Sequence, residues 1–210
     1  MGNNRRKIKR IVIFGNGKLH KKFLRDIQAG DYVIGVDRAA YWLIRQGRTP
    51  DIAIGDFDST TKQEVDLIKK SIKLVKHYPQ EKDQTDMELA VRYVATLPPA
   101  EVFIFGATGG RLDHMLATLH LIDKQVLVDE NNRVRLMGRG KTMLERSSYR
   151  YVSIIPYTKS ITVSLTGFRY NIDRKIIKKT SSLGVSNEII GKMGKIEIFS
   201  GRAWVIESND

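Results

Sequence analysis

Short apolar runs alternate with helical patterns through the first two thirds of the chain, and this alternation constrains the fold more than any other feature. Strands that alternate with helices build a mainly parallel sheet covered by helices. The apolar runs lie at residues 11–14, 32–36, 52–54, 72–75, 102–105 and 126–128. We therefore expect an α/β domain with a mainly parallel, Rossmann-like sheet and flanking helices.

Two of the intervening segments show clear helical periodicity. Thr85 and Glu88 have the spacing of a capping box at the start of one helix. Its apolar face comprises Met87, Ala90, Val91 and Val94. The second helix is expected to begin at Arg111, and its apolar stripe comprises Leu112, Met115, Leu116, Leu119 and Ile122. Residues at this spacing share one face of a helix, so we expect both stripes to be core.

From about Gly138 the pattern changes to short strands separated by Gly, Asn and Ser turns. Strands are expected at residues 151–155, 160–165, 175–179, 195–199 and 203–207. Ile161, Val163 and Leu165 alternate with polar residues, as in an antiparallel sheet with one buried face. This part of the chain is therefore predicted to be a small antiparallel β-sandwich. The charged stretch 129–135 is interpreted as a connection, which places the predicted domains at residues 1–135 and 136–210.

The composition excludes several classes of protein. The 210 residues include no cysteine, which rules out disulfides, thiolate metal sites and a cysteine nucleophile. No apolar run approaches the roughly 18 residues of a membrane span, and the basic start of the chain precedes a strand-like run instead of a signal-peptide core. We therefore expect a cytoplasmic protein without a membrane partner.

The formal net charge of +13 raises the alternative of a nucleic-acid-binding protein. Arg5, Arg6, Lys7, Lys9 and Arg10 form a basic cluster near the start. The other Lys and Arg residues are spread along the chain, and the aromatic residues, 8% of the total, are not interleaved with the basic run as single-strand binders require. We expect no specific nucleic-acid partner and a positive field that attracts anionic ligands.

Two carboxylates, Asp56 and Asp58, follow the apolar run 52–54 directly. Gly55 permits a sharp turn, and an extended backbone would project both carboxylates together. Their mutual repulsion is commonly offset by a hard cation such as Mg²⁺. Asp37 follows the run 32–36, and because ligands bind at the carboxyl ends of parallel strands, these acids are expected to share one crevice. The alternative is a solvated turn that leads into a helix cap at Ser59 or Thr60.

Two further acids lie in the segment that leads into the capped helix, Asp83 before Thr85 and Asp86 in the first helical turn. They are expected to approach the same crevice if their loop faces it. Asp86 has an alternative role, because an acid in the first turn of a helix interacts favourably with the helix dipole.

A glycine-rich segment, Thr108, Gly109, Gly110 and Arg111, follows the run 102–105 and opens a helix. Such a turn exposes backbone N–H groups at a positive helix end, which suits a phosphate group, and Arg111 can add a bidentate clamp. His114 is assigned a nucleotide contact. The alternative is a tight turn with an ordinary surface arginine. The segment 135–142 is not a P-loop, because Arg135 occupies the position of its first glycine.

Seven segments together resemble the thiamine pyrophosphokinase (thiamine diphosphokinase) family. They are residues 35–40, 50–59, 82–88, 109–114, 167–170, 184–188 and 201–206. The segments follow the order and spacing expected for the family and together span nearly the whole chain. The resemblance departs from the family pattern at Ala39, where many members have glycine, and at Gly15-Asn16-Gly17, where a plain Gly-Gly is common.

The resemblance implies a homodimer that transfers a pyrophosphoryl group from ATP to the hydroxyl of thiamine and releases AMP, with Mg²⁺ as cofactor. It implies Mg²⁺ ligands at Asp56, Asp58 and Asp86, with Asp83 close by. It implies ATP contacts at Asp37, Arg38, Thr108, Gly109, Gly110, Arg111, Asp113 and His114. It implies a thiamine pocket at Ser186, Asn187 and Trp204, partly across the dimer interface.

The chemistry of these residues fits that reaction, because pyrophosphoryl transfer needs positioning and charge neutralisation more than a covalent group. Asp83 or Asp86 could accept the proton of the attacking hydroxyl. Trp204 could lie against the cationic thiazolium ring, or pack in the sandwich core. Three other functions stay open: a pterin-alcohol pyrophosphokinase, a basic nucleic-acid-binding protein, and a nucleotide-binding regulator without catalysis.

Overall fold

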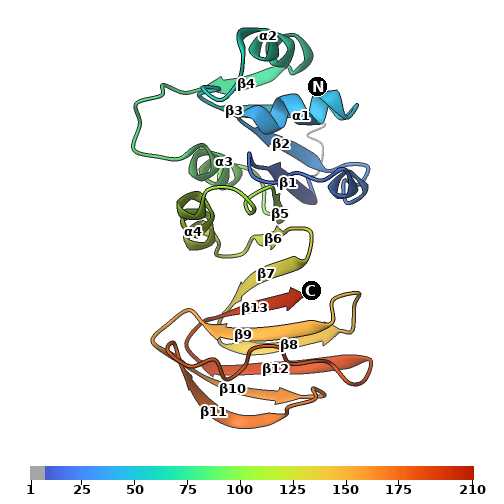
Figure 1. The fold of residues 1–210 in the computed structure, drawn as a ribbon, viewed down its shortest axis with the longest axis vertical. Coiled ribbons are helices and arrows are strands. Elements are labelled where there is room, and N and C mark those ends of the chain that lie inside the picture. Colours follow the sequence, from blue (N-terminus) through green and yellow to red (C-terminus); the bar gives the residue numbers. More distant parts are fainter. Residues whose placement is uncertain (1–7) are drawn as a thin grey trace, which may run out of the picture. The chain divides into compact units, whose positions relative to one another are not determined.

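The computed structural model describes residues 8–210, so of the basic cluster only Lys9 and Arg10 lie in the described part. The chain divides into two compact units, Met1–Gln125 and Val126–Asp210. Figure 1 shows the order of their elements along the chain. The division falls before the predicted boundary at residues 135 and 136, which lies inside a strand.

The first unit contains a parallel sheet, as expected. The strands run in the order β4-β3-β2-β1-β5, and each neighbouring pair is parallel. Their bounds are β1 Arg10–Phe14, β2 Tyr32–Val36, β3 Ile52–Gly55, β4 Leu74–His77 and β5 Glu101–Phe105. β4 begins two residues later than the predicted run, because Ile72 instead ends the preceding helix and is buried against Ile68 and Phe57.

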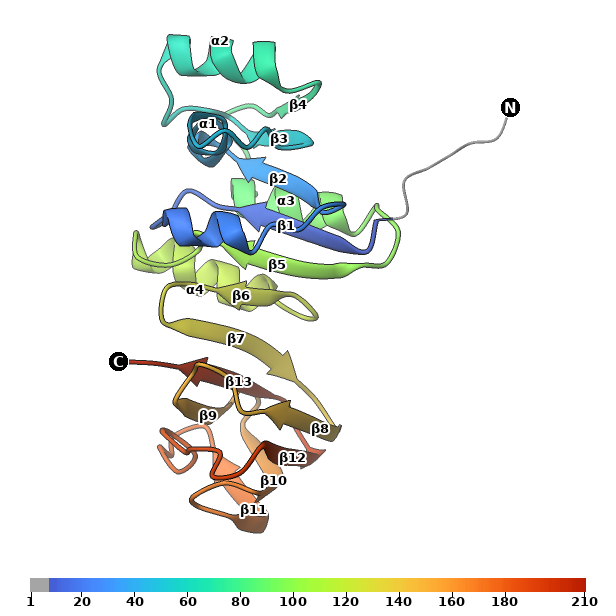
Figure 2. The ribbon, with the colours of Figure 1, turned by 90° about the vertical axis from the view of Figure 1, so that its right-hand side faces the viewer.

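Helices cover this sheet on both faces. They are the 3₁₀ helix η1 Lys21–Arg25 and the α-helices α1 Arg38–Arg45, α2 Lys62–Ser71, α3 Asp86–Val94 and α4 Leu112–Leu121. In Figures 1 and 2, α3 and α4 lie on one face of the sheet and η1 lies on the other. The longest helices of residues 8–210 have ten residues, and none reaches the length and hydropathy of a membrane span.

Two threonines cap helices of the first unit. Thr85 accepts a hydrogen bond from the backbone N–H of Glu88, whose carboxylate pairs with Arg92, so only half of the predicted capping box forms. The complete capping box belongs to α2, where Thr61 and Glu64 bond reciprocally. Satisfying the free N–H groups at these helix starts stabilises the loops that precede them.

The prediction that the apolar stripe of α4 is core is wrong for two of its leucines. Leu112 is 63% exposed and Leu116 is 48% exposed. The buried residue of this helix is Thr118, whose hydroxyl donates a hydrogen bond to the carbonyl of His114. The periodicity predicted the helix but not which side of it packs.

The second unit is antiparallel, as expected. One group of strands has the order β6-β7-β13-β9, with bounds Val126–Val128, Asn132–Met137, Ala203–Ser208 and Tyr151–Pro156. The other sheet has the order β11-β10-β12-β8, with bounds Ile172–Lys178, Ser160–Thr166, Met193–Ser200 and Gly140–Glu145. The interpretation of residues 129–135 as a connection is wrong, because β7 covers most of them and buries Val134.

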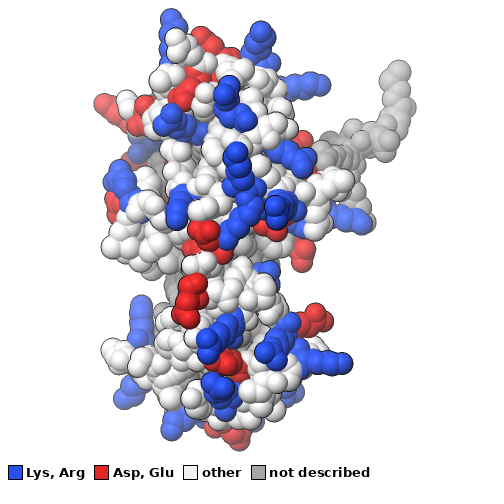
Figure 3. All heavy atoms as spheres, turned by 45° about the vertical axis from the view of Figure 1, so that its right-hand side comes forward, with Lys and Arg blue, Asp and Glu red and all other residues white. Residues whose placement is uncertain are grey.

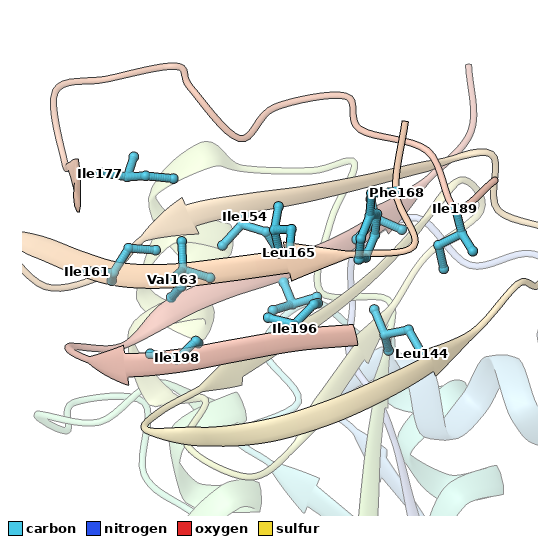
Figure 4. Packing of buried hydrophobic residues seen from close by; sticks show 13 residues of the cluster. Leu144, Ile154, Ile161, Val163, Leu165, Phe168, Ile177, Ile189, Ile196 and Ile198 are labelled. Carbon is cyan, nitrogen blue, oxygen red and sulfur yellow. The ribbon is translucent and has the colours of Figure 1, made fainter. Parts of the chain in front are cut away.

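An apolar cluster lies between the strands of residues 140–208 in the second unit (Figure 4). Alternate residues of β10 and β12 point into it, and Phe168 contributes a fully buried ring. The labelled members are Leu144, Ile154, Ile161, Val163, Leu165, Phe168, Ile177, Ile189, Ile196 and Ile198. The alternation of Ile161, Val163 and Leu165 in the sequence therefore predicted the buried face of the sandwich correctly.

Gly194 is expected to be required for the packing of this cluster. A Cβ atom at Gly194 would lie 2.5 Å from the ring of Phe168 and 3.0 Å from Ile189. Overpacking of this kind typically destabilises a protein by about 1–3 kcal/mol, so Gly194→Ala should lower the urea midpoint accordingly. Gly191→Ala is the matched control, because nothing lies within 4 Å of its Cβ position. Equal midpoints for the two variants would contradict the close packing.

Candidate active site

The structure brings three of the predicted acids together at the carboxyl ends of β2 and β3. Asp37 follows β2 and Asp56 follows β3, and the backbone N–H of Asp37 donates a 2.8 Å hydrogen bond to the carbonyl of Ile54. Each of Asp37, Asp56 and Asp58 offers a carboxylate oxygen, and these oxygens lie within 4.8 Å of one another. Adjacent parallel strands therefore produce the shared crevice that the sequence predicts.

Asp37 is buried and held in an unusual backbone conformation, with φ 51° and ψ −130°. Its Oδ2 accepts hydrogen bonds from the hydroxyl of Ser59 at 2.5 Å and from the side-chain amide of Asn16 at 3.1 Å. Its Oδ1 is buried and accepts no hydrogen bond from residues 8–210. Burial raises the pKa of Asp37, although the Ser59 hydrogen bond acts in the opposite direction. Strain and an unpartnered oxygen on one residue are typical of a functional site.

Asp56 and Asp58 are separated in the sequence by Phe57, whose side chain is buried. Phe57 has φ 59° and packs in the core between α1, β3 and α2, so the expected extended backbone is wrong at this residue. Asp56 Oδ1 accepts a 3.1 Å hydrogen bond from the N–H of Asp58, and Asp58 Oδ2 accepts one of 3.2 Å from Gln80. The buried ring thus fixes the loop that carries both acids.

Lys82 joins the acid cluster, which the sequence analysis missed. Its ammonium pairs with Asp56 Oδ2 and lies 3.2 Å from Asp86 Oδ1. Burial acts to raise the pKa of Asp56, but hydrogen bonds from Lys82 and from the N–H of Asp58 outweigh it, so the pKa is lowered. Burial, reinforced by the charge of Asp56, raises the pKa of Asp86. The signal in the sequence was a lysine directly before the predicted acid Asp83.

A cavity of about 360 Å³ is lined by six of the predicted site residues, whereas Asp56, Thr108, Gly109 and Asp113 lie outside its lining. Its lining residues are Asn16, Gly17, Val36, Asp37, Asp58, Ser59, Asp86, Met87, Gly106, Ala107, Gly110, Arg111, His114 and Thr118. Asp86, Gly110, Arg111 and His114 are therefore brought into one hollow with Asp37 and Asp58. Asp83 is exposed and lies outside this lining.

Two close turns form the glycine-rich side of the cavity. The N–H of Gly17 donates to the carbonyl of Gly106 at 2.7 Å, and the N–H of Lys18 donates to the carbonyl of Thr108 at 2.8 Å. A Cβ atom at Gly109, which has φ 75°, would lie 2.6 Å from the side chain of Lys18. Glycine is therefore needed at this position for the approach of the two turns.

Three predicted nucleotide contacts, Arg111, Asp113 and Arg38, have partners within the protein. Arg111 pairs with Asp113 at 2.6 Å, and both side chains are exposed at the start of α4. The guanidinium lowers the pKa of Asp113 to about 2. Arg38 is half exposed, pairs with Glu64 at 2.9 Å, and lies outside the cavity lining.

The acid cluster fits a hard divalent cation. Within residues 8–210, Asp37, Asp56 and Asp58 offer oxygens within 4.8 Å of one another, and Lys82 connects a fourth carboxylate, Asp86, to Asp56. The buried oxygens Asp37 Oδ1 and Asp86 Oδ1 accept no hydrogen bond from the described part of the chain. Mg²⁺ prefers carboxylate oxygens and retains waters and substrate phosphates as further ligands. Carboxylate oxygens that accept no hydrogen bond are free to coordinate such an ion.

The predicted thiamine residues lie in the second unit. Ser186 is exposed with φ 58°, and its N–H donates a 3.0 Å hydrogen bond to Ser153. Asn187 is buried, and its side-chain amide bonds to the N–H and the carbonyl of Tyr170. Trp204 is half-buried and meets Tyr157 edge to face at 5.4 Å. Its neighbours Ala203 and Val205 point into the apolar cluster, so the alternative that Trp204 packs in the sandwich core is wrong.

Asp37→Asn should increase stability at neutral pH when divalent cations are removed by a chelator. The folded protein raises the pKa of Asp37, so it binds protons more readily than the unfolded chain does, and its stability falls as the pH rises through this pKa. The advantage of the variant should therefore be present at pH 7 and vanish as the pH falls towards about 4.

Thermal unfolding measured across this pH range checks the expectation. Asp66→Asn, at an exposed acid on α2, is the control. A stability difference that does not change with pH would contradict the assignment of the effect to the Asp37 carboxyl.

Comparisons with known proteins agree with this arrangement. A sequence profile for the thiamin pyrophosphokinase catalytic domain matches residues 23–136, and one for the thiamin pyrophosphokinase vitamin B1 binding domain matches residues 141–202. Thiamine pyrophosphokinase of Bacillus subtilis (strain 168) is 37% identical over 186 residues, which cover 84% of this chain and 87% of that protein.

Solved structures agree over a larger share of the chain. Thiamine pyrophosphokinase from Bacillus subtilis superposes with a TM-score of 0.89 at 34% identity, covering 96% of this chain and 100% of its own. Thiamin pyrophosphokinase from Geobacillus thermodenitrificans superposes with a TM-score of 0.88 at 31% identity, covering 96% and 98%. The two profiles match in order along a chain with the same fold, and the chain belongs to the thiamine pyrophosphokinase family.

Proposed function

We propose that this chain transfers the terminal pyrophosphoryl group of ATP to the hydroxyl of thiamine, with Mg²⁺, and releases thiamine diphosphate and AMP. The observation that carries the proposal is the cavity in which the buried Asp37 and its neighbours Asp58 and Asp86 line the same hollow as a glycine-rich turn and a helix start. Such a combination suits a metal ion and a polyphosphate side by side. Membership of the family supplies the reaction and the acceptor.

The proposed Mg²⁺ ligands are Asp56, Asp58 and Asp86, with Asp37 beside them. Asp37, Asp56 and Asp58 already place their oxygens within 4.8 Å of one another. Bound Mg²⁺ would neutralise charge on the phosphate oxygens during transfer. The hydrogen bonds from Asn16 and Ser59 to Asp37 Oδ2 leave its other oxygen available to a ligand.

The start of α4 is proposed to receive the polyphosphate. Gly110 lines the cavity where the free N–H groups of this helix begin. Arg111 lies at the same start, and its pairing with Asp113 orients the guanidinium at the rim. His114, Thr108 and Gly109 complete the proposed nucleotide contacts. Arg38 can contribute only if it leaves Glu64.

Asp86 is proposed as the residue that accepts the hydroxyl proton, in preference to Asp83. Asp86 lines the cavity, and an oxygen of its carboxylate that does not bind the metal could accept the proton of a hydroxyl bound there. Asp83 is exposed and outside the cavity lining.

Ser186 and Trp204 are proposed to contact thiamine. The aromatic face of Trp204 would favour the cationic thiazolium ring. Asn187 would act through the backbone of Tyr170, to which its amide is bonded. A homodimer, a cytoplasmic location and a division of roles between residues 1–135 and 136–210 belong to the same proposal.

The charge distribution does not favour the nucleic-acid alternative. On the face seen in Figure 3, Lys and Arg side chains are spread over the surface with Asp and Glu side chains between them. A protein that follows a nucleic-acid backbone concentrates its positive charge in a patch or groove.

Asp56→Asn should abolish most of the thiamine-dependent release of AMP. Loss of a carboxylate that binds the metal removes charge stabilisation of the transition state, and comparable losses lower kcat by roughly a hundredfold or more. A coupled assay with ATP and Mg²⁺, with and without thiamine, measures the effect. Asp66→Asn should behave as the wild type. AMP release with a pterin alcohol but not with thiamine would overturn the proposed acceptor.

Trp204→Ala should raise the KM for thiamine without a similar change in the KM for ATP. A cation–π contact of about 1–2 kcal/mol corresponds to roughly a five- to thirtyfold change in KM. Trp204→Phe should recover part of the loss, and Trp42→Phe, at the other tryptophan of the chain, is the control. An equal rise in both KM values would contradict a thiamine contact.

A further inference from the structure

Lys82 pairs with two of the acids at the site, although it belongs to no helix or strand. It lies in the loop between β4 and α3, four residues before Asp86. Its ammonium pairs with Asp56 and approaches Asp86 at 3.2 Å, and its side chain is only 11% exposed. A cation in this place satisfies one acid that follows β3 and another that begins α3.

The two acids paired with Lys82 are among the proposed metal ligands. Asp86 Oδ1 lies close to the ammonium but accepts no hydrogen bond from residues 8–210. The contact is therefore electrostatic at Asp86 and hydrogen-bonded at Asp56. An ammonium and a hard metal ion seek the same carboxylate oxygens, and two cations a few ångströms apart in a partly buried site repel each other strongly.

We propose that Lys82 is an internal counter-ion of the acid cluster, which a divalent cation must displace in order to bind Asp56 and Asp86. This inference rests on the proposed metal site. The lysine stabilises the cluster before the metal arrives and lowers the affinity for the metal by competing with it.

Displacement leaves a tethered ammonium beside the cavity. The flexible four-carbon stem of lysine allows the charge to move without a change in the backbone. A polyphosphate that enters with the metal offers new anionic partners to the released ammonium. Lys82 is thus assigned as a positioning residue. Its ammonium leaves the carboxylates of Asp56 and Asp86 and then pairs with the phosphate oxygens of the substrate.

The first test compares Mn²⁺ binding to the wild type, Lys82→Met and Lys82→Arg in the absence of nucleotide, by electron paramagnetic resonance of free Mn²⁺. Lys82→Met removes the competitor and should tighten the Kd about tenfold, which corresponds to about 1.4 kcal/mol. Lys82→Arg keeps a cation and should bind no more tightly than the wild type. Unchanged or weaker binding by Lys82→Met would overturn the inference.

The second test uses the wild type and so does not depend on the folding of a variant. Lysines are acetylated with a limiting reagent and quantified by mass spectrometry, with and without Mg²⁺. Labelling of Lys82 should rise several-fold when Mg²⁺ is added, because the ammonium leaves its two partners. Lys195, which pairs with Glu197 at 3.0 Å in the second unit, should not respond. Labelling of Lys82 that stays constant while Mg²⁺ binds would overturn the inference.

The outcomes distinguish this inference from the proposed function. Absence of Mn²⁺ binding in both the wild type and Lys82→Met, with both proteins folded by circular dichroism, would overturn the metal site itself and with it the inference. Equal binding by both would overturn only the role of Lys82 and leave the proposed reaction intact.

Discussion

Repulsion among carboxylates, three at the carboxyl ends of β2 and β3 and one at the start of α3, is the constraint on which the rest of this site depends. The hydrogen bond from Asp37 N–H to the carbonyl of Ile54 brings the ends of β2 and β3 together, and their acids with them. Several features offset the resulting charge and strain. Phe57, which lies between Asp56 and Asp58 in the sequence, buries its ring in the core, and Asn16 and Ser59 bond to one oxygen of Asp37. Strained backbone and buried charge persist only where the surroundings hold them in place.

Prediction from the sequence succeeded where short-range patterns determine structure. The apolar run 52–54 and the acids that follow it were sufficient to predict β3 and a shared site with Asp37, because strand ends in a parallel sheet lie at one edge. The contacts of Asn16 and Lys82 could not be predicted in the same way. Asn16 reaches Ser59 across 43 positions and Lys82 reaches Asp56 across 26. Such pairs depend on loop conformations that no local periodicity describes.

The errors of prediction share a physical cause, which is that the polarity of a side chain does not always determine whether it is exposed to solvent. The stretch before Met137 looked like a charged connection, yet Arg133 and Arg135 pair with the buried Glu207 on the neighbouring strand β13. A charged stretch can therefore form a strand when its charges are paired, and the residue types alone do not reveal this pairing. The opposite error occurred in α4, where Leu112 remains exposed although its spacing matches a core stripe. Whether a face is covered depends on the other elements around it.

The residue type at position 82 suits an exchangeable partner better than the alternatives do. An arginine has a planar fork that binds carboxylates bidentately, which would make its departure from Asp56 and Asp86 more difficult. A neutral residue would leave the two acids opposed only by solvent. A lysine brings one compact charge on a flexible stem, enough to reduce the repulsion but less than the two charges of Mg²⁺. Asp37 Oδ1 accepts no hydrogen bond from the described residues, and the oxygens of Asp56 and Asp86 become available when the lysine leaves, so the resting cluster is stable and still ready to bind metal.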